Sequence, residues 1–469
     1  MRKRILSLLT AAAIVVSFTG CAPQGTTGNS SENKETQDSQ TEEEEKQTIK
    51  IGAVYPLTGT SAETGNQTIN TLKAMAELIN NEYDIDYPFA KTQGLPNLGN
   101  ARIEIIAADS QGNPEVGATE AERLITEENV TGLIGCDASG VTKTASAVAE
   151  KYGIPFINAE SSSPTLTERG LKYFFRTGPT DATFVEDTFN YMDLYREEAG
   201  FENVAIIADE AEAGVNFKEL CEAAAENHGY NIVQSITYPG NPTGLTSEVL
   251  KLKDAKPDVV LIYALTAEAI LYTNTCKDLD FSPKATFTAR GGFVATEYFD
   301  TCGKDVDYIF TANAWSMDLA NTKPYLTEIN NLAKKFSNHD MTGNTARAAQ
   351  GFLIFADAIN RAGSTDADAI VKALEDTDMN EEYLIVPWTG VTFDESHQNT
   401  QATGIITQIQ NQAYVTVYPD SAKSADSIIP AGAVYDIAVA GPNRGDIYRN
   451  DHCLNSNGSF AYLGSHVYR

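Results

Sequence analysis

The sequence predicts an α/β protein with two Rossmann-like lobes, each a mostly parallel sheet flanked by helices. The chain has 469 residues, of which 42% are hydrophobic and 21% charged, a globular composition with length enough for two or three lobes. From Thr48 onward, short β-branched apolar runs alternate with segments of helical periodicity. This alternation is typical of parallel sheets with helices on both faces, and it occurs in two successive series, which predicts two lobes.

The N-terminus has the pattern of an export signal. Basic residues at positions 2–4 precede an apolar stretch from Ile5 to Phe18, which is too short for a comfortable membrane span. The segment "FTGC" then resembles a bacterial lipobox, although Leu is usual where this chain has Phe18. We expect residues 1–20 to be a lipoprotein signal peptide and Cys21 to carry lipid. A plain secretory signal, or an N-terminal membrane helix with an incidental cysteine, is the alternative.

Residues 21–47 are expected to form a disordered tether. After Cys21 this segment has no aliphatic or aromatic residue larger than Ala and Pro, so it cannot bury a core. Such a flexible chain would have a root-mean-square reach of about 28 Å. The acidic run from Glu42 to Glu45 is read as a solvated spacer rather than a metal site. The net charge of −30 argues against nucleic acid as a partner.

The first series of elements extends to about residue 200. A typical member is the helix at 65–83, in which Ile69, Leu72 and Ile79 fall on one face. In chain order the series contains strands at 48–56, 101–109, 130–135, 154–159 and 172–179, and helices at 65–83, 114–128, 141–153 and 181–200.

The second series begins at residue 203 and repeats the alternation. It contains strands at 203–209, 230–239, 258–265 and 284–289, and helices at 214–229, 245–256 and 266–279. The later elements are a strand within 305–315, helices from about 324, at 344–363 and at 367–376, and hairpin-like segments at 390–396 and 403–419.

Short hydroxyl side chains follow two strands of the first series. Ser161, Ser162 and Ser163 come after the strand at 154–159, and Ser139 lies in the loop "GCDASG" after the preceding strand. Ligands of open α/β sheets bind at the carboxyl ends of strands, where helix starts favour a carboxylate or another polar group. The alternative is a turn in which Ser163 caps a short helix.

An exported hydrolase is the rival from another functional class. The sequence contains no G-x-S-x-G, H-E-x-x-H or P-loop pattern, and its five histidines are scattered. Cys136 follows a strand without an evident catalytic partner and is expected to be a small buried side chain. The cysteines have no C-x-x-C spacing, and a disulfide such as Cys276 with Cys302 cannot be assigned from sequence. We expect no metal and no cofactor.

Several segments resemble the branched-chain amino-acid (leucine/isoleucine/valine) binding protein family, the extracytoplasmic receptors of ABC importers with the type I periplasmic-binding-protein fold. The resemblance extends from about Thr48 to about Pro430. The segments that carry it are "IGAVYPLTGTSAETG", "LIGCDASGVTKTASAVAEKYGIPFINAESSSPTLTERG", "NVAIIADEAEAG" and "RAGSTDADAI".

The resemblance implies two lobes that close on a ligand about a hinge of three crossovers. The crossovers are expected near Pro179, near Asn313 to Trp315 and near Gly404. Lobe I would then comprise 48–179 and 314–403, lobe II 180–313 and 404–430, and 431–469 would be a C-terminal extension outside the resemblance.

The resemblance also assigns the serines a role. In the family, a Ser in the first loop, and a small residue plus a Ser or Thr in the second, bind the ligand's α-carboxylate. These positions match Ser139, Ser161 and Ser162. Asp181 is expected near the cleft by the hinge, with a helix N-cap as the equal alternative.

Five positions depart from the family pattern. Thr64 stands where an aromatic residue covers the ligand, and Ala213 and Leu265 stand at two tyrosines of the second lobe. Thr345 replaces another aromatic. Gly291 replaces the acidic residue that neutralises the ligand's ammonium group, and a buried ammonium without that partner would cost several kcal/mol.

A standard branched-chain amino acid is therefore not expected as the ligand. Glu160, at a position where the family often has Gly, and Glu210 or Glu212 could supply a relocated carboxylate. Arg290 and Arg347 could instead bind a second anionic group. Solvated or structurally paired charges are the alternative for each.

These inferences predict a monomeric bacterial surface lipoprotein without enzymatic activity. It would capture a small amino-acid-like or carboxylate solute and present it to the permease subunits of an ABC importer, held at the membrane through lipidated Cys21. A ligand-sensing lobe pair that signals through a separate membrane protein is the alternative.

Overall fold

The computed structural model describes residues 47–59, 61–240, 242–289, 291–294 and 296–429, together with three short strands near the C-terminus. The predicted signal peptide, nearly all of the tether, Cys21 and Arg290 lie outside the described residues, as does the side chain of Glu212. In the described part of the chain, no helix is both long and apolar enough to cross a bilayer.

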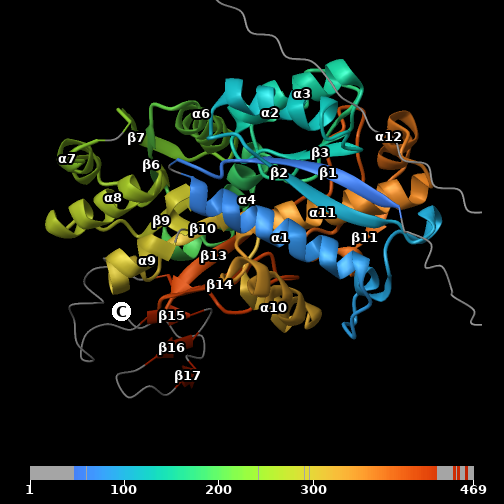
Figure 1. Ribbon diagram of the computed structural model, residues 1–469. Coiled ribbons are helices and arrows are strands. Elements are labelled where there is room, and N and C mark those ends of the chain that lie inside the picture. The colour runs from blue at the N-terminus through green and yellow to red at the C-terminus, as the bar shows by residue number, and fades with distance from the viewer. Residues whose placement is uncertain are drawn as a thin grey trace, which may run out of the picture. The chain divides into compact units, whose positions relative to one another are not determined.

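The first sheet is parallel and has the strand order β2-β1-β3-β4-β5. Helices cover both of its faces: α2 and α3 lie on one side of β1 and β2, and α1 lies on the other (Figure 1). The core on the α1 side also receives apolar side chains from α10, α11 and α12. The elements are β1 (Thr48–Tyr55), β2 (Arg102–Asp109), β3 (Gly132–Gly135), β4 (Phe156–Asn158), β5 (Phe174–Arg176), α1 (Ala62–Asn80), α2 (Pro114–Thr126), α3 (Ser139–Tyr152), α10 (Tyr325–Ser337), α11 (Gly343–Ala362) and α12 (Ala367–Glu375).

The second sheet has the order β14-β13-β10-β9-β8-β6-β7, parallel from β10 to β7 and antiparallel at β13 and β14. One core packs α4 and α6 against it, and another packs α7, α8 and α9. The elements are α4 (Asp181–Leu194), β6 (Asn203–Asp209), α6 (Glu212–Asn227), β7 (Asn231–Tyr238), α7 (Thr246–Ala255), β8 (Val259–Tyr263), α8 (Thr266–Asp278), β9 (Ala285–Ala289), α9 (Thr296–Cys302), β10 (Phe310–Asn313), β13 (Ile405–Gln410) and β14 (Ala413–Tyr418). The predicted class of mostly parallel sheets flanked by helices is confirmed.

The chain passes between the two sheets three times. It leaves the first sheet after β5 for α4, leaves the second after β10 for α10 and α11, and returns at β13. Gly404 lies at the last passage, where its N–H donates to Asp187 Oδ2 at 2.9 Å, and a Cβ there would lie 2.6 Å from the same oxygen. Glycine is therefore needed for this close approach. The exact lobe boundaries given above stay a prediction.

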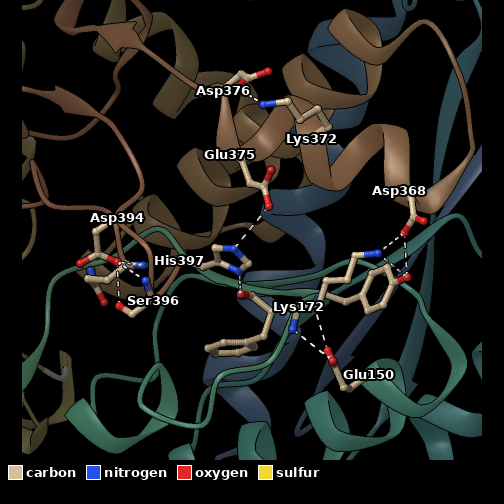
Figure 2. Close-up of polar contacts among 12 residues, drawn as sticks. Glu150, Lys172, Asp368, Lys372, Glu375, Asp376, Asp394, Ser396 and His397 are labelled. Carbon is tan, nitrogen blue, oxygen red and sulfur yellow. Dashed lines mark hydrogen bonds and ion pairs between the residues drawn. The ribbon is translucent and has the colours of Figure 1, made fainter.

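Loop residues pair with the outer edge of the first sheet at β5. Arg176 N–H donates to the carbonyl of His397, and Asn399 N–H donates to the carbonyl of Arg176, each at 2.9 Å. Lys172, two residues before β5, has its Nζ 2.7 Å from Asp368 Oδ1 (Figure 2). An exposed strand edge can pair with another chain, and these contacts occupy it.

The structure differs from the sequence-based expectation in three places. The helix expected at 181–200 is interrupted at Tyr195, which has φ −110° and ψ 6° and separates α4 from α5 (Arg196–Ala199). Helix α9 was not expected. The segment at 390–396 turns back as expected, with an antiparallel bridge between Phe393 and Asn399, but it also contributes β12 (Gly390–Val391), whose pairing with β11 (Met379–Asn380) was not expected.

The second hairpin-like segment also forms a hairpin, from β13 and β14. Its turn residues Asn411 and Gln412 both have positive φ, 53° and 62°, the backbone that tight two-residue hairpins require. Beyond residue 430, three short antiparallel strands are described, β15 (Ile447–Arg449), β16 (His452–Leu454) and β17 (Phe460–Tyr462).

Candidate ligand-binding site

A cavity of about 1370 Å³ lies at the carboxyl ends of strands from both sheets. The first sheet contributes the loops after β1, β3 and β4, and the second contributes those after β6, β8 and β9 together with the start of α11. This is the position at which open α/β sheets bind ligands. The residues singled out from the sequence that line the cavity are Thr64, Ser139, Glu160, Ser161, Ser162, Asp181, Ala213, Leu265, Gly291 and Arg347.

The two serine loops meet in the cavity wall. Ser139 is the first residue of α3, and its Oγ accepts the backbone N–H of Ser163 at 3.4 Å. The hydroxyl of Ser161 is turned inward, 2.7 Å from the carbonyl oxygen of Cys136 and 2.7 Å from Thr142 Oγ1. Ser161 therefore fastens one loop to the other, and Ser139 and Ser162 line the cavity beside it.

The capping alternative for Ser163 is wrong for its side chain. Pro164 does begin a short 3-10 helix, Pro164–Leu166, as that alternative requires. The Ser163 hydroxyl makes no capping bond and instead lies 3.1 Å from Thr165 Oγ1.

Glu160 is the most unusual polar residue of the wall. It lies after β4, is 3% exposed, and its Oε1 accepts a hydrogen bond from the Tyr55 hydroxyl at 2.8 Å. Its Oε2 is buried and has no hydrogen-bond partner among the described residues. Burial raises the pKa of this carboxyl to about 8, although Arg347 and the Tyr55 hydroxyl pull the pKa downward. Such a group is a candidate for direct ligand contact.

Arg347 holds the wall together beside Glu160. The residue is 1% exposed, and its Nη1 donates to the carbonyl oxygen of Glu160 at 2.6 Å. Its Nε donates to the carbonyl of Gly343 at 3.2 Å, and its Nη2 to Asn344 Oδ1 at 2.6 Å. Because all three nitrogens of the guanidinium donate to protein oxygens, the structure favours a structural role for Arg347 over a contact with an anionic group of the ligand.

The backbone at Gly291 leaves no room for a side chain. Gly291 has φ 53°, and a Cβ built there would lie 2.6 Å from the carbonyl oxygen of Ala264. A Glu or Asp side chain would therefore require a different path for this loop. Its neighbour in the wall, Leu265, is 53% exposed.

Two predicted site residues take different roles. Thr345 is not among the residues that line the cavity; it is 1% exposed and completes the capping box of α11 with Thr342. Asp181 lines the cavity, but it does not cap α4, because that role belongs to Thr180. Asp181 Oδ2 instead accepts a hydrogen bond from Asn216 Nδ2 at 3.2 Å.

Aromatic side chains of the second sheet line the cavity and were missed from the sequence. Tyr263 ends β8, and Phe217 of α6 lies beside it with ring centroids 6.0 Å apart. Phe184 of α4 also faces the cavity. The strand-end rule that selected the serines applies equally to Tyr263, whereas Phe217 and Phe184 have the sequence pattern of ordinary core residues.

Four cysteines, Cys136, Cys221, Cys276 and Cys302, are unbonded and buried. Cys276 and Cys302 are free, so the disulfide considered above is absent from the described residues. Cys136 is 1% exposed, and burial raises the pKa of its thiol far above the usual range, which makes it a poor nucleophile. Among the described residues, no group of His, Cys, Asp and Glu side chains is arranged to hold a metal ion.

The structure has two sheets, each covered by helices on both faces, and a cavity at the carboxyl ends of their strands. This arrangement defines the class of type I periplasmic binding proteins. The chain belongs to the periplasmic binding protein family, since the model of that family matches residues 48–413.

Curated relatives and solved structures agree with this assignment. The chain is 28% identical over 395 residues to Leu/Ile/Val-binding protein homolog 7 of Brucella abortus, covering 81% of this chain and 94% of the relative. Its fold is similar to the leucine binding protein LivK of Thermotoga maritima, with TM-score 0.65 and 18% identity over 78% of this chain and 97% of the other. It is also similar to LivJ of Streptococcus pneumoniae, solved with isoleucine, with TM-score 0.64 and 21% identity over 79% and 100% of the two chains.

Proposed function

We propose that this protein captures a small amino-acid-like or carboxylate solute in the cavity and delivers it to the permease of an ABC importer. The meeting of the two serine loops at the start of α3 is the observation that carries the proposal, because hydroxyls and a helix N-terminus suit a carboxylate. The relatives described as branched-chain amino-acid binding proteins support it.

Hinge closure would complete the site in this proposal. The solute would bind first to one wall of the cavity, and the two sheets would then approach about the three chain passages. A ligand drives such closure only through its higher affinity for the closed state. The side chains of Ser139 and Ser162 would supply contacts from the first sheet, and Tyr263 and Asn216 would supply contacts from the second.

The first test removes the hydroxyls. A thermal-shift screen of the purified protein against amino acids, amides, dicarboxylates and short peptides should identify a ligand. A ligand whose concentration is 100 times its dissociation constant adds about 2.7 kcal/mol to the free energy of unfolding. Replacing both Ser139→Ala and Ser162→Ala should then weaken binding of that ligand by more than about 1 kcal/mol, because hydrogen bonds to a charged group contribute about 1.5–3 kcal/mol each. Ser247→Ala, on the exposed surface of α7, is the matched control. Unchanged affinity in the double variant would contradict the carboxylate site.

We further propose that the protein works outside the cytoplasm, anchored by lipid on Cys21, a residue outside the described part of the chain. In bacteria that process lipoproteins, the wild-type protein should label with radioactive palmitate and fractionate with membranes, whereas Cys21→Ser should do neither. A Cys21→Ser variant that still labels would refute the anchor.

A further inference from the structure

We propose that the solute is a cation, an amine or guanidine whose positively charged group binds the side chain of Glu160. This inference rests on the proposed function, because it specifies the chemical class of the solute that the cavity captures. It rests on the geometry around Glu160 and on the charges of the cavity wall.

The first argument is the unsatisfied oxygen of Glu160. The Oε1 atom has the Tyr55 hydroxyl as a donor, whereas the buried Oε2 has no donor among the described residues. When the carboxyl is ionised, a buried oxygen without a donor costs about 1–3 kcal/mol, so ionisation is favoured where a bound group supplies the hydrogen bond. An ammonium or guanidinium group supplies both the N–H donor and the opposite charge.

The second argument is the imbalance of charge around the cavity. Among the described residues of the wall, Arg347 is the only Lys or Arg, and its guanidinium already binds three protein oxygens. Arg290 lies outside the described residues, and adding its charge would leave the acids in large excess. Besides Glu160, the carboxyl side chains of the wall are those of Glu63, Asp137, Asp181, Glu219, Glu297 and Asp300. Such a wall attracts cations and repels a dicarboxylate.

The third argument is the aromatic side chains that α4, β8 and α6 contribute to the wall. Tyr263, which is partly exposed, lines the same cavity together with the largely buried Phe217 and Phe184. The faces of aromatic rings attract organic cations, and their apolar area suits the alkyl chain that carries such a cation. The wall thus combines the two chemistries that recognise an alkylamine or alkylguanidine.

Binding of a cation to Glu160 should also release a proton. The groups that face this carboxyl are Tyr55 from β1, Cys136 and Asp137 from the loop after β3, and Arg347 from α11. With its pKa raised to about 8 by burial, the carboxyl is mostly protonated at pH 7, and an incoming cation favours the ionised form. The heat of binding should therefore differ between buffers of different ionisation enthalpy, such as phosphate and Tris.

The experiment is isothermal titration calorimetry of the purified protein at pH 7 with L-lysine, agmatine, L-norleucine and L-glutamate. L-Norleucine is L-lysine without the terminal ammonium group, so this pair isolates one positive charge. We expect L-lysine or agmatine to bind at least tenfold more tightly than L-norleucine, with proton release. Glu160→Gln should abolish the preference, and Glu197→Gln, an exposed residue of α5, should keep it.

Each other outcome decides against the inference. If L-norleucine or L-glutamate binds as tightly as both cations, or if Glu160→Gln keeps the preference, solute capture stands and the cationic class is wrong. If no compound of the panel, extended with L-leucine and L-isoleucine, gives heat of binding or a thermal shift, the proposed function fails and the inference fails with it.

Discussion

Replacing Glu160 with glutamine should make the ligand-free protein more stable, and the gain should increase between pH 5 and pH 8. The folded-state pKa of this carboxyl is raised from 4.5 to about 8, mainly by burial. Between these values the unfolded chain releases the proton while the folded protein keeps it, so the wild type loses stability as pH rises through this window. Glutamine does not titrate and avoids the loss.

The difference should amount to a few kcal/mol at pH 8, because one pKa unit corresponds to about 1.4 kcal/mol. Urea unfolding of both proteins at pH 5, 6.5 and 8 measures it. Glu197→Gln makes the same change of charge at an exposed position and should leave the pH dependence as in the wild type. Parallel pH profiles for wild type and Glu160→Gln would show that the buried carboxyl is not protonated in the folded state.

Replacing Arg347 with methionine should destabilise the protein by at least about 2 kcal/mol, because each buried acceptor left without its donor costs about 1–3 kcal/mol. The carbonyl oxygens of Glu160 and Gly343 would each lose the donor that Arg347 supplies. Glu160 would also lose the positive charge that holds its pKa down, so the carboxyl should protonate still more readily. Arg347→Lys should not restore stability, because an ammonium group cannot reproduce the three-armed contact.

A double-mutant cycle separates these two contributions. At pH 8, where a large fraction of the wild-type carboxyl is ionised, the cost of Arg347→Met should be smaller in the Glu160→Gln background, because glutamine has no charge for Arg347 to stabilise. Lys335→Met, on the exposed face of α10, is the control for loss of a cation and should change the free energy of unfolding by less than about 0.5 kcal/mol. A cost below about 1 kcal/mol for Arg347→Met would mean that the guanidinium is not part of the fold's support.

Most of the architecture could be predicted from local pattern. Strands such as β1 and β6 are apolar runs that end in turns, and helices such as α11 have one continuous apolar face, so their existence and order follow from periodicity. The interruption at Tyr195 could not be predicted, since no Gly or Pro precedes it within α4. Helix α9 could not be predicted either, because it is short and follows two consecutive glycines, a pattern that is typical of a loop.

The cavity wall was predicted in part. Ser139 and Ser162 could be placed because strand ends and helix starts are local features, and the structure brings their loops together. The inward orientation of the Ser161 side chain could not be predicted, because nothing in the sequence distinguishes it from the two serines that follow. The resemblance predicted Thr345 in the cavity wall. Its hydroxyl instead accepts the backbone N–H of Thr342 at the start of α11, so it caps the helix.

Local sequence pattern is enough to predict the alternation of strands and helices, the two series, and the polar loops that end the strands. What those loops can bind depends on the folded structure. The surroundings of Glu160 include Tyr55, 105 residues away in sequence, and Arg347, 187 residues away. The raised pKa of Glu160 arises from burial by neighbours that are distant in sequence, and desolvation depends on the packed surroundings rather than on the residue itself.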